Sequence, residues 1–203
     1  RQMCIRDRQY YIYSLFCFLL PGTVWLICNR RMIADKAYKV RHIIWIYIYM
    51  FYGYLAVQEA AGIGTIWDLI TYGKLDNSIN LIPFSSEGAM TYNLNIIMFM
   101  PFGFLLPLIW KNFRNAKKVV LMGFLMSLAI EICQLFNLRA TDIDDLMMNT
   151  LGALVGYCCW KVFSLIFRNA GTKCMEIKKS EPVIYMFGGI LGLFLLYNWR
   201  VFD

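Results

Sequence analysis

Six blocks of mostly apolar residues constrain this chain more than any other feature of its sequence. The blocks lie at residues 10–28, 42–62, 94–110, 119–137, 146–167 and 183–199. A helix rises about 1.5 Å per residue, so roughly 20 apolar residues cross the ~30 Å hydrocarbon core of a bilayer. The pattern therefore predicts an all-α fold, a polytopic transmembrane helix bundle of about six spans.

The composition agrees with a membrane protein. Hydrophobic residues make up 60% of the 203 residues and charged residues 16%, whereas soluble domains carry about 25% charged residues. One soluble core could not bury all six blocks. After the second block, residues 63–73 set apolar side chains against Asp68 and Thr71. This amphipathic pattern predicts a helix that lies in the membrane interface and does not cross.

The basic residues are distributed unevenly among the loops. Thirteen Lys and Arg residues lie at 29–41, 111–118 and 168–182, whereas the intervening loops carry only Lys74 and Arg139. Cytoplasmic loops are the basic ones in membrane proteins. We therefore expect a multi-pass protein of the cell membrane with loops 63–93 and 138–145, and both termini, on the outer side.

Several classes of function lack the residues that they need. The seven cysteines form no Cys-x-x-Cys pair and His42 is the only histidine, so zinc and haem sites are not expected. We expect His42 to be interfacial and not catalytic. No cofactor motif and no serine-hydrolase, zinc-protease or phosphate-loop motif is present. The net charge of +7 lies in loops, so nucleic acid is not an expected partner.

The chain reads as one domain. Residues 1–8, Arg-Gln-Met-Cys-Ile-Arg-Asp-Arg, look like translated sequencing-adaptor read-through, and we expect them to be a non-native leader. Residues 9–203 are expected to form a single membrane domain with its core at 43–160. The spans at 10–28 and 183–199 are additions to that core.

Polar residues recur on one face of the fourth span. Gly123, Ser127, Glu131 and Gln134 follow a spacing of four, four and three residues, which places them on one helical stripe. Glu131 lies about two turns from the outer end, so its carboxylate needs a partner, a proton or a hydrated cavity. Intramembrane ionisable groups of this kind are by default candidates for function.

The fifth span repeats this pattern. Asp145, Asn149, Gly152 and Gly156 follow a spacing of four, three and four, with the polar pair toward the outer end. Glycines spaced in this way permit close approach of another helix. We expect the stripes of the fourth and fifth spans to face each other.

The segments that precede these two stripes also carry polar residues. The loop at 138–145 adds Arg139 as a cation among carboxylates, and Asp142 or Asp144 could cap the fifth span. In the third span, Asn95 is followed by Pro101 and Gly103, which predict a break or kink in mid-membrane. Residues 80–84, with Pro83, predict a loop that caps or re-enters the outer face.

Each of these features also has a structural interpretation. Glu131, Arg139 and Asp145 could form a polar lock between helices that serves packing alone. The glycines are more simply packing devices than ligand contacts. Asp144 could be a solvated loop charge.

Together these residues resemble the VanZ-like family of small bacterial membrane proteins. The resemblance covers roughly residues 43–160. It is carried by Asn80-Leu-Ile-Pro83-Phe84, Asn95, Phe99-Met-Pro101-Phe-Gly103-Phe, Ser127-Leu-Ala-Ile-Glu131-Ile-Cys-Gln134-Leu-Phe136, Arg139, and Asp142-Ile-Asp144-Asp145 through Asn149-Thr-Leu-Gly152-Ala to Gly156-Tyr157. It implies a protein of the bacterial cell envelope, in a family whose founding member is associated with low-level resistance to the glycopeptide teicoplanin. It implies no known reaction.

The leading hypothesis is an envelope protein that binds, and could modify, an amphiphile at the outer leaflet. The ligand would be an envelope lipid, a lipid-linked glycan precursor or a lipoglycopeptide. Glu131 and Asp145 would act as acid or base, and Asp142 with Asp145 could hold a divalent cation. The expected ligand-binding residues are Asn80, Asn95, Gln134, Arg139, Asp142 and Asn149.

Two other functions stay open. A small transporter or flippase would use the kinked third span and the carboxylates in mid-membrane. A non-catalytic scaffold would use the same polar cluster only to hold its helices together. Oligomerisation is compatible with all three hypotheses.

Overall fold

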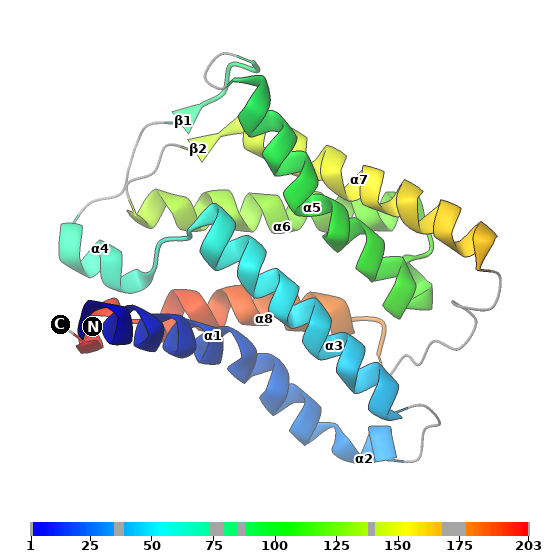
Figure 1. Ribbon diagram of the computed structural model, residues 1–203, viewed down its shortest axis with the longest axis horizontal. Helices are drawn as coiled ribbons and strands as arrows, with labels where there is room; N and C mark the ends of the chain where they lie inside the picture. Colours follow the sequence, from blue (N-terminus) through cyan, green and yellow to red (C-terminus); the bar gives the residue numbers. More distant parts are fainter. Residues whose placement is uncertain are drawn as a thin grey trace.

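The structure is a computed structural model that describes residues 2–34, 39–73, 79–84, 88–137, 141–167 and 178–202. Six longer helices dominate it (Figure 1): α1 Gln2–Cys28, α3 Lys39–Tyr54, α5 Ala89–Ile109, α6 Ala116–Gln134, α7 Ile143–Ile166 and α8 Glu181–Leu196. The shorter helical elements are α2 Arg30–Ala34, the π-helix η1 Leu55–Ala61, α4 Ile66–Tyr72, η2 Lys111–Phe113, η3 Leu135–Asn137 and η4 Trp199–Phe202. The all-α prediction is confirmed.

Five of the helical stretches are long and apolar enough to cross a membrane. They are Gln9–Cys28, Lys39–Gln58, Met90–Ile109, Ala116–Asn137 and Ile143–Ile166. The sixth expected span is the apolar helix α8, whose 16 residues extend about 24 Å. It lies beside α1 in Figure 1. The predicted amphipathic helix forms as α4, where Thr65 and Asp68 make a capping box.

The prolines do not break the helices that contain them. Helix α5 continues through Pro101 and Pro107, and α1 continues through Pro21. Of the predicted break or kink at Pro101 and Gly103, the break does not occur. A proline deletes one helical hydrogen bond, and neighbouring helices can hold the remaining bonds in register.

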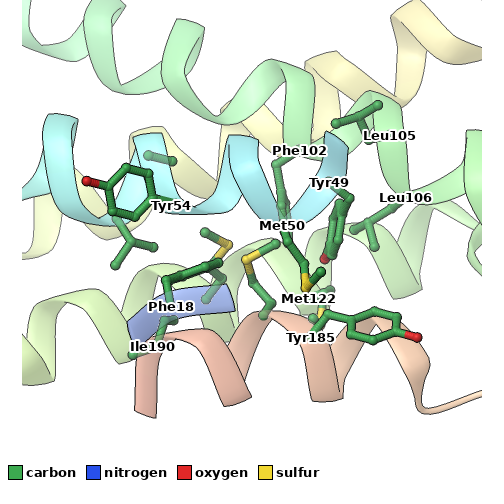
Figure 2. Close-up of a cluster of buried hydrophobic side chains, with 14 of the residues drawn as sticks. Phe18, Tyr49, Met50, Tyr54, Phe102, Leu105, Leu106, Met122, Tyr185 and Ile190 are labelled. Carbon is green, nitrogen blue, oxygen red and sulfur yellow. The ribbon is translucent and has the colours of Figure 1, made fainter. Parts of the chain in front are cut away.

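The hydrophobic core lies where α1, α3, α5, α6 and α8 meet. Figure 2 shows Phe18, Tyr49, Met50, Phe102 and Tyr185 converging there from several helices. The rings of Tyr49 and Phe102 stack with centroids 5.8 Å apart. Each of these five side chains is at most 1% exposed. The core therefore fixes α3 and α8 against the helices that carry the polar residues.

A buried polar cluster lies at the end of the bundle where α8 begins. Glu181 is fully buried and accepts a hydrogen bond from Trp110 Nε1 at 2.9 Å. His42 Nε2 lies 3.4 Å from Glu181 Oε1, and the Tyr185 hydroxyl donates to the same oxygen at 3.4 Å. His42 is thus buried in the bundle, at 5% exposure. These bonds tie together α3, α8 and the end of α5.

Candidate functional site

Helices α5 and α7 approach each other so closely that only glycine fits at several contacts. A Cβ atom on Gly152 would lie 2.4 Å from the Ile96 carbonyl oxygen, and one on Gly156 would lie 2.0 Å from that of Met100. Positions four apart on α7 thus meet positions four apart on α5, so the two helices run in the same direction. The small-residue face of the fifth span therefore packs on the third span. The expectation that this face meets the fourth span is wrong for Gly152 and Gly156.

The fourth and fifth spans nevertheless meet through their polar stripes. Asn149 Nδ2 lies 3.0 Å from the Ser127 hydroxyl oxygen. A Cβ atom on Gly123 would lie 2.5 Å from the Cβ of Ala153. The prediction that these stripes face each other is therefore confirmed for the contacts of Ser127 and Gly123, while Gly152 and Gly156 face α5.

A short parallel bridge joins the two segments that enter α5 and α7. Strand β1, Ile79–Asn80, pairs with β2, Thr141–Asp142 (Figure 1). Asp142 is the N-cap of α7, because its Oδ1 accepts from Asp144 N at 2.9 Å. Its other oxygen accepts from Asn80 Nδ2 at 3.1 Å. Asn80 and Asp142, two of the predicted ligand-binding residues, thus hold together the segments that enter α5 and α7.

Asp144 is not a solvated loop charge, which corrects that interpretation of the sequence. Its side chain is fully buried. It accepts from the Phe84 backbone N–H at 2.8 and 3.0 Å and from the Tyr92 hydroxyl at 2.9 Å. Phe84 has a φ of 60°, a backbone conformation that costs a non-glycine residue energy. The carboxylate therefore holds the 79–84 segment in a strained turn over the start of α5.

The two carboxylates of the sequence hypothesis lie on neighbouring helices. Glu131 is 3% exposed, and its Oε2 accepts from Asp142 N at 3.3 Å. Asp145 Oδ1 accepts a hydrogen bond from Asn95 Nδ2. Glu131, Asp145 and Asn95 thus come from α6, α7 and α5.

These side chains line one cavity of about 600 Å³. Ligand-binding pockets commonly have volumes of roughly 300–1,000 Å³. The polar part of its wall includes Asn95, Glu131, Gln134, Asp145 and Asn149. Asn80 and Asp142 stand behind this wall, and Arg139 lies outside the residues that the structure describes. The cavity thus gathers five of the eight residues that we predicted for the site.

The opposite part of the wall is apolar and comes from η1 and α5. Leu55, Leu94 and Ile97 line the cavity and are also 39%, 56% and 60% exposed on the outer surface of the bundle. In a transmembrane protein this surface faces lipid. The cavity therefore has an apolar rim toward the membrane and a polar wall toward the bundle interior.

Two contributors to the cavity were not expected from the sequence. Tyr52 lines it but stands in an apolar block, where aromatic residues are usually core or interface. The π-helix η1 places Ala56, Ala60 and Ala61 on the wall. π-helical turns occur frequently at functional sites, but the sequence of 55–61 carries no signal for one.

The wall does not assemble a metal site from described residues. Across those residues, no three His, Cys, Asp or Glu side chains gather in a way that could hold an ion. Both oxygens of Asp142 accept hydrogen bonds. The expected pair of Asp142 and Asp145 gains no support as a divalent cation site.

Comparison with known proteins settles the family. The family model VanZ/LLP1 matches residues 40–165, more than half of the chain. The chain belongs to this family. It is also 38% identical over 134 residues to Protein VanZ of Enterococcus faecium, an alignment that covers 65% of this chain and 77% of that protein. No solved structure matches the chain.

The VanZ/LLP1 match includes every residue that lines the cavity. The lining residues run from Tyr52 to Asn149, within the matched range of 40–165. Helices α1 and α8 lie outside that range. The cavity is therefore built wholly by the part of the chain that resembles the family.

Proposed function

We propose that this VanZ-like protein binds the head group of an amphiphile that reaches the cavity from the outer leaflet of the bacterial cell membrane. The observation that carries the proposal is the combination of an apolar, lipid-facing rim with a polar wall at the same cavity. An acyl chain can stay against the rim while the head group meets the wall. A lipid-linked glycan precursor, another envelope lipid or a lipoglycopeptide has this chemistry.

The position of the cavity along the helices supports binding from the outer leaflet. The cavity lies at the beginning of α7 and the end of α6, and it follows α5 from Thr91 to Pro101, about the first half of that helix. The basic loops lie at the opposite ends of these helices, and such loops are cytoplasmic. The lining residues of α5, α6 and α7 gather at one end of the bundle, which favours binding over a path across the membrane.

Glycopeptide tolerance is the cellular effect that we infer from this binding. A protein that holds a lipid precursor or the drug itself at the outer leaflet would lower the amount of teicoplanin on its target. A chemical modification of the ligand would fall to Glu131 and Asp145, because these are the carboxylates of the cavity wall.

Exchange of Glu131 tests the proposal. Glu131→Gln keeps the shape of the side chain and removes its charge, so it should abolish teicoplanin tolerance while the protein still accumulates in the membrane. Glu181→Gln is the matched control, because Glu181 is equally buried but lies outside the cavity. Tolerance that survives Glu131→Gln, with both variants present at wild-type amounts, would remove the cavity from the mechanism.

A further inference from the structure

Buried oxygen atoms without a protein partner are concentrated at the cavity. Tyr52, Gln134 and Asn149 each carry one, namely the Tyr52 hydroxyl, Gln134 Oε1 and Asn149 Oδ1. Six such oxygen atoms occur in the part of the chain that is described, and three of them belong to cavity-lining residues. A buried polar group without a partner costs roughly 1–3 kcal/mol, so three at one cavity point to a ligand that supplies the partners.

The hydrogen bonds that these side chains already make determine whether their remaining atoms can donate to a ligand or accept from it. Gln134 donates from Nε2 to the Ala61 carbonyl at 2.9 Å, so its remaining atom is an acceptor. Asn149 uses its amide nitrogen on Ser127, which leaves a second acceptor. The Tyr52 hydroxyl can both donate and accept.

This set selects among the head groups of membrane lipids. A phosphate offers only acceptors and cannot satisfy the two amide oxygens. An ammonium group could pair with the carboxylates of the wall, but it offers only donors, so the hydrogen of the Tyr52 hydroxyl would stay without an acceptor. A sugar offers several neutral hydroxyl groups, each of which both donates and accepts. The three oxygens expose almost no surface, so a ligand reaches them only after small side-chain rotations, which the torsionally soft terminal bonds of Asn and Gln allow.

We propose that the cavity recognises the neutral sugar of a membrane glycolipid through the Tyr52 hydroxyl, Gln134 Oε1 and Asn149 Oδ1. This inference rests on the proposed function, because it names the class of amphiphile that the cavity takes. The glycolipid's acyl chains lie against the rim of Leu55, Leu94 and Ile97.

Two tyrosines of α3 provide a matched pair of variants. The hydroxyl groups of Tyr49 and Tyr52 are both buried without a partner in the described structure, but only Tyr52 lines the cavity. Figure 2 shows Tyr49 in the hydrophobic core beside Phe102. Neither hydroxyl holds the fold together, so Tyr49→Phe and Tyr52→Phe should both fold.

The experiment titrates the purified full-length protein in detergent with three lipids that share the same acyl chains, and follows thermal stabilisation. The lipids are monoglucosyl-diacylglycerol, phosphatidylglycerol and phosphatidylethanolamine. We expect the glucolipid to stabilise the wild type and Tyr49→Phe at equal concentrations. Tyr52→Phe should need about fivefold more glucolipid, the loss of one neutral hydrogen bond.

Each other outcome overturns the sugar assignment. Equal glucolipid titrations for all three proteins would show that the Tyr52 hydroxyl does not contact the lipid. Equal weakening of glucolipid binding in both variants would mean that the effect comes from helix packing. Stronger stabilisation by phosphatidylglycerol or phosphatidylethanolamine would reject the sugar but leave amphiphile binding intact. Stabilisation by none of the three lipids, together with teicoplanin tolerance that survives Glu131→Gln, would contradict the proposed function as well.

Discussion

Replacement of Gly156 by alanine should separate helices α5 and α7. The added Cβ atom would lie 2.0 Å from the Met100 carbonyl oxygen, and 2.9 Å from the Met100 carbonyl carbon and from Phe104 N. Ordinary close C···O contacts are about 3.3 Å, so the backbones must move apart by about 1.3 Å. All three of these contacts are backbone atoms, which cannot rotate out of the way.

The cost of that movement follows from the packing of the two helices. Overpacking costs about 1–3 kcal/mol, and a gap of about 1 Å forfeits up to half of the dispersion energy of the contacts that it opens. Alanine returns about 1 kcal/mol through its higher helix propensity. With the upper end of the overpacking range, about 3 kcal/mol, we expect a net loss of about 2 kcal/mol, which corresponds to a fall in Tm of about 4–8 °C for a chain of this length.

The assay is thermal unfolding of the detergent-purified protein, followed by tryptophan fluorescence. Gly188→Ala is the matched control, since its Cβ atom would meet only Pro21 at 3.4 Å, an ordinary van der Waals contact. The control should unfold at or above the wild-type temperature. A Gly156→Ala protein that unfolds at the wild-type temperature would refute the close approach of α5 and α7.

Substitutions at three further residues test the polar contacts at the two ends of the bundle, each by the same thermal assay. Asp144→Leu leaves the Phe84 N–H and a tyrosine hydroxyl without their acceptor, so it should cost about 2–4 kcal/mol; Asp144→Asn should cost less than half of that. Glu181→Leu strands the indole N–H of Trp110 and should cost about 2–3 kcal/mol, and a neutral result would show that this buried cluster is not formed. Asp142→Ala removes the N-cap of α7 and should cost about 1 kcal/mol.

The sequence predicted which residues share a helix face but not which helix that face meets. The spacing of Asp145, Asn149, Gly152 and Gly156 placed them on one stripe, and the structure agrees. Helical periodicity defines a direction around one axis and carries no information on the neighbour in that direction. The glycines were therefore assigned to α6, although they pack on α5.

The roles of single polar residues depended on contacts made far along the chain. Asp142 and Asp144 were both predicted as possible caps because capping is local, and Asp142 is the cap of α7. Asp144 was given a solvated alternative because its partners, Phe84 and Tyr92, are about 50 to 60 residues away. Tyr52 was missed because its place at the cavity depends on the arrangement of η1, α5 and α6.

Native mass spectrometry of the protein released from its own membrane tests amphiphile binding most directly. We predict that the wild type retains one amphiphile per chain through detergent exchange. Ala60→Phe adds a ring to the cavity wall and should remove this mass, whereas Val162→Phe, at a 57% exposed position of α7 outside the cavity, should keep it. A wild type without a bound amphiphile, or equal retention by both variants, would contradict binding at this cavity.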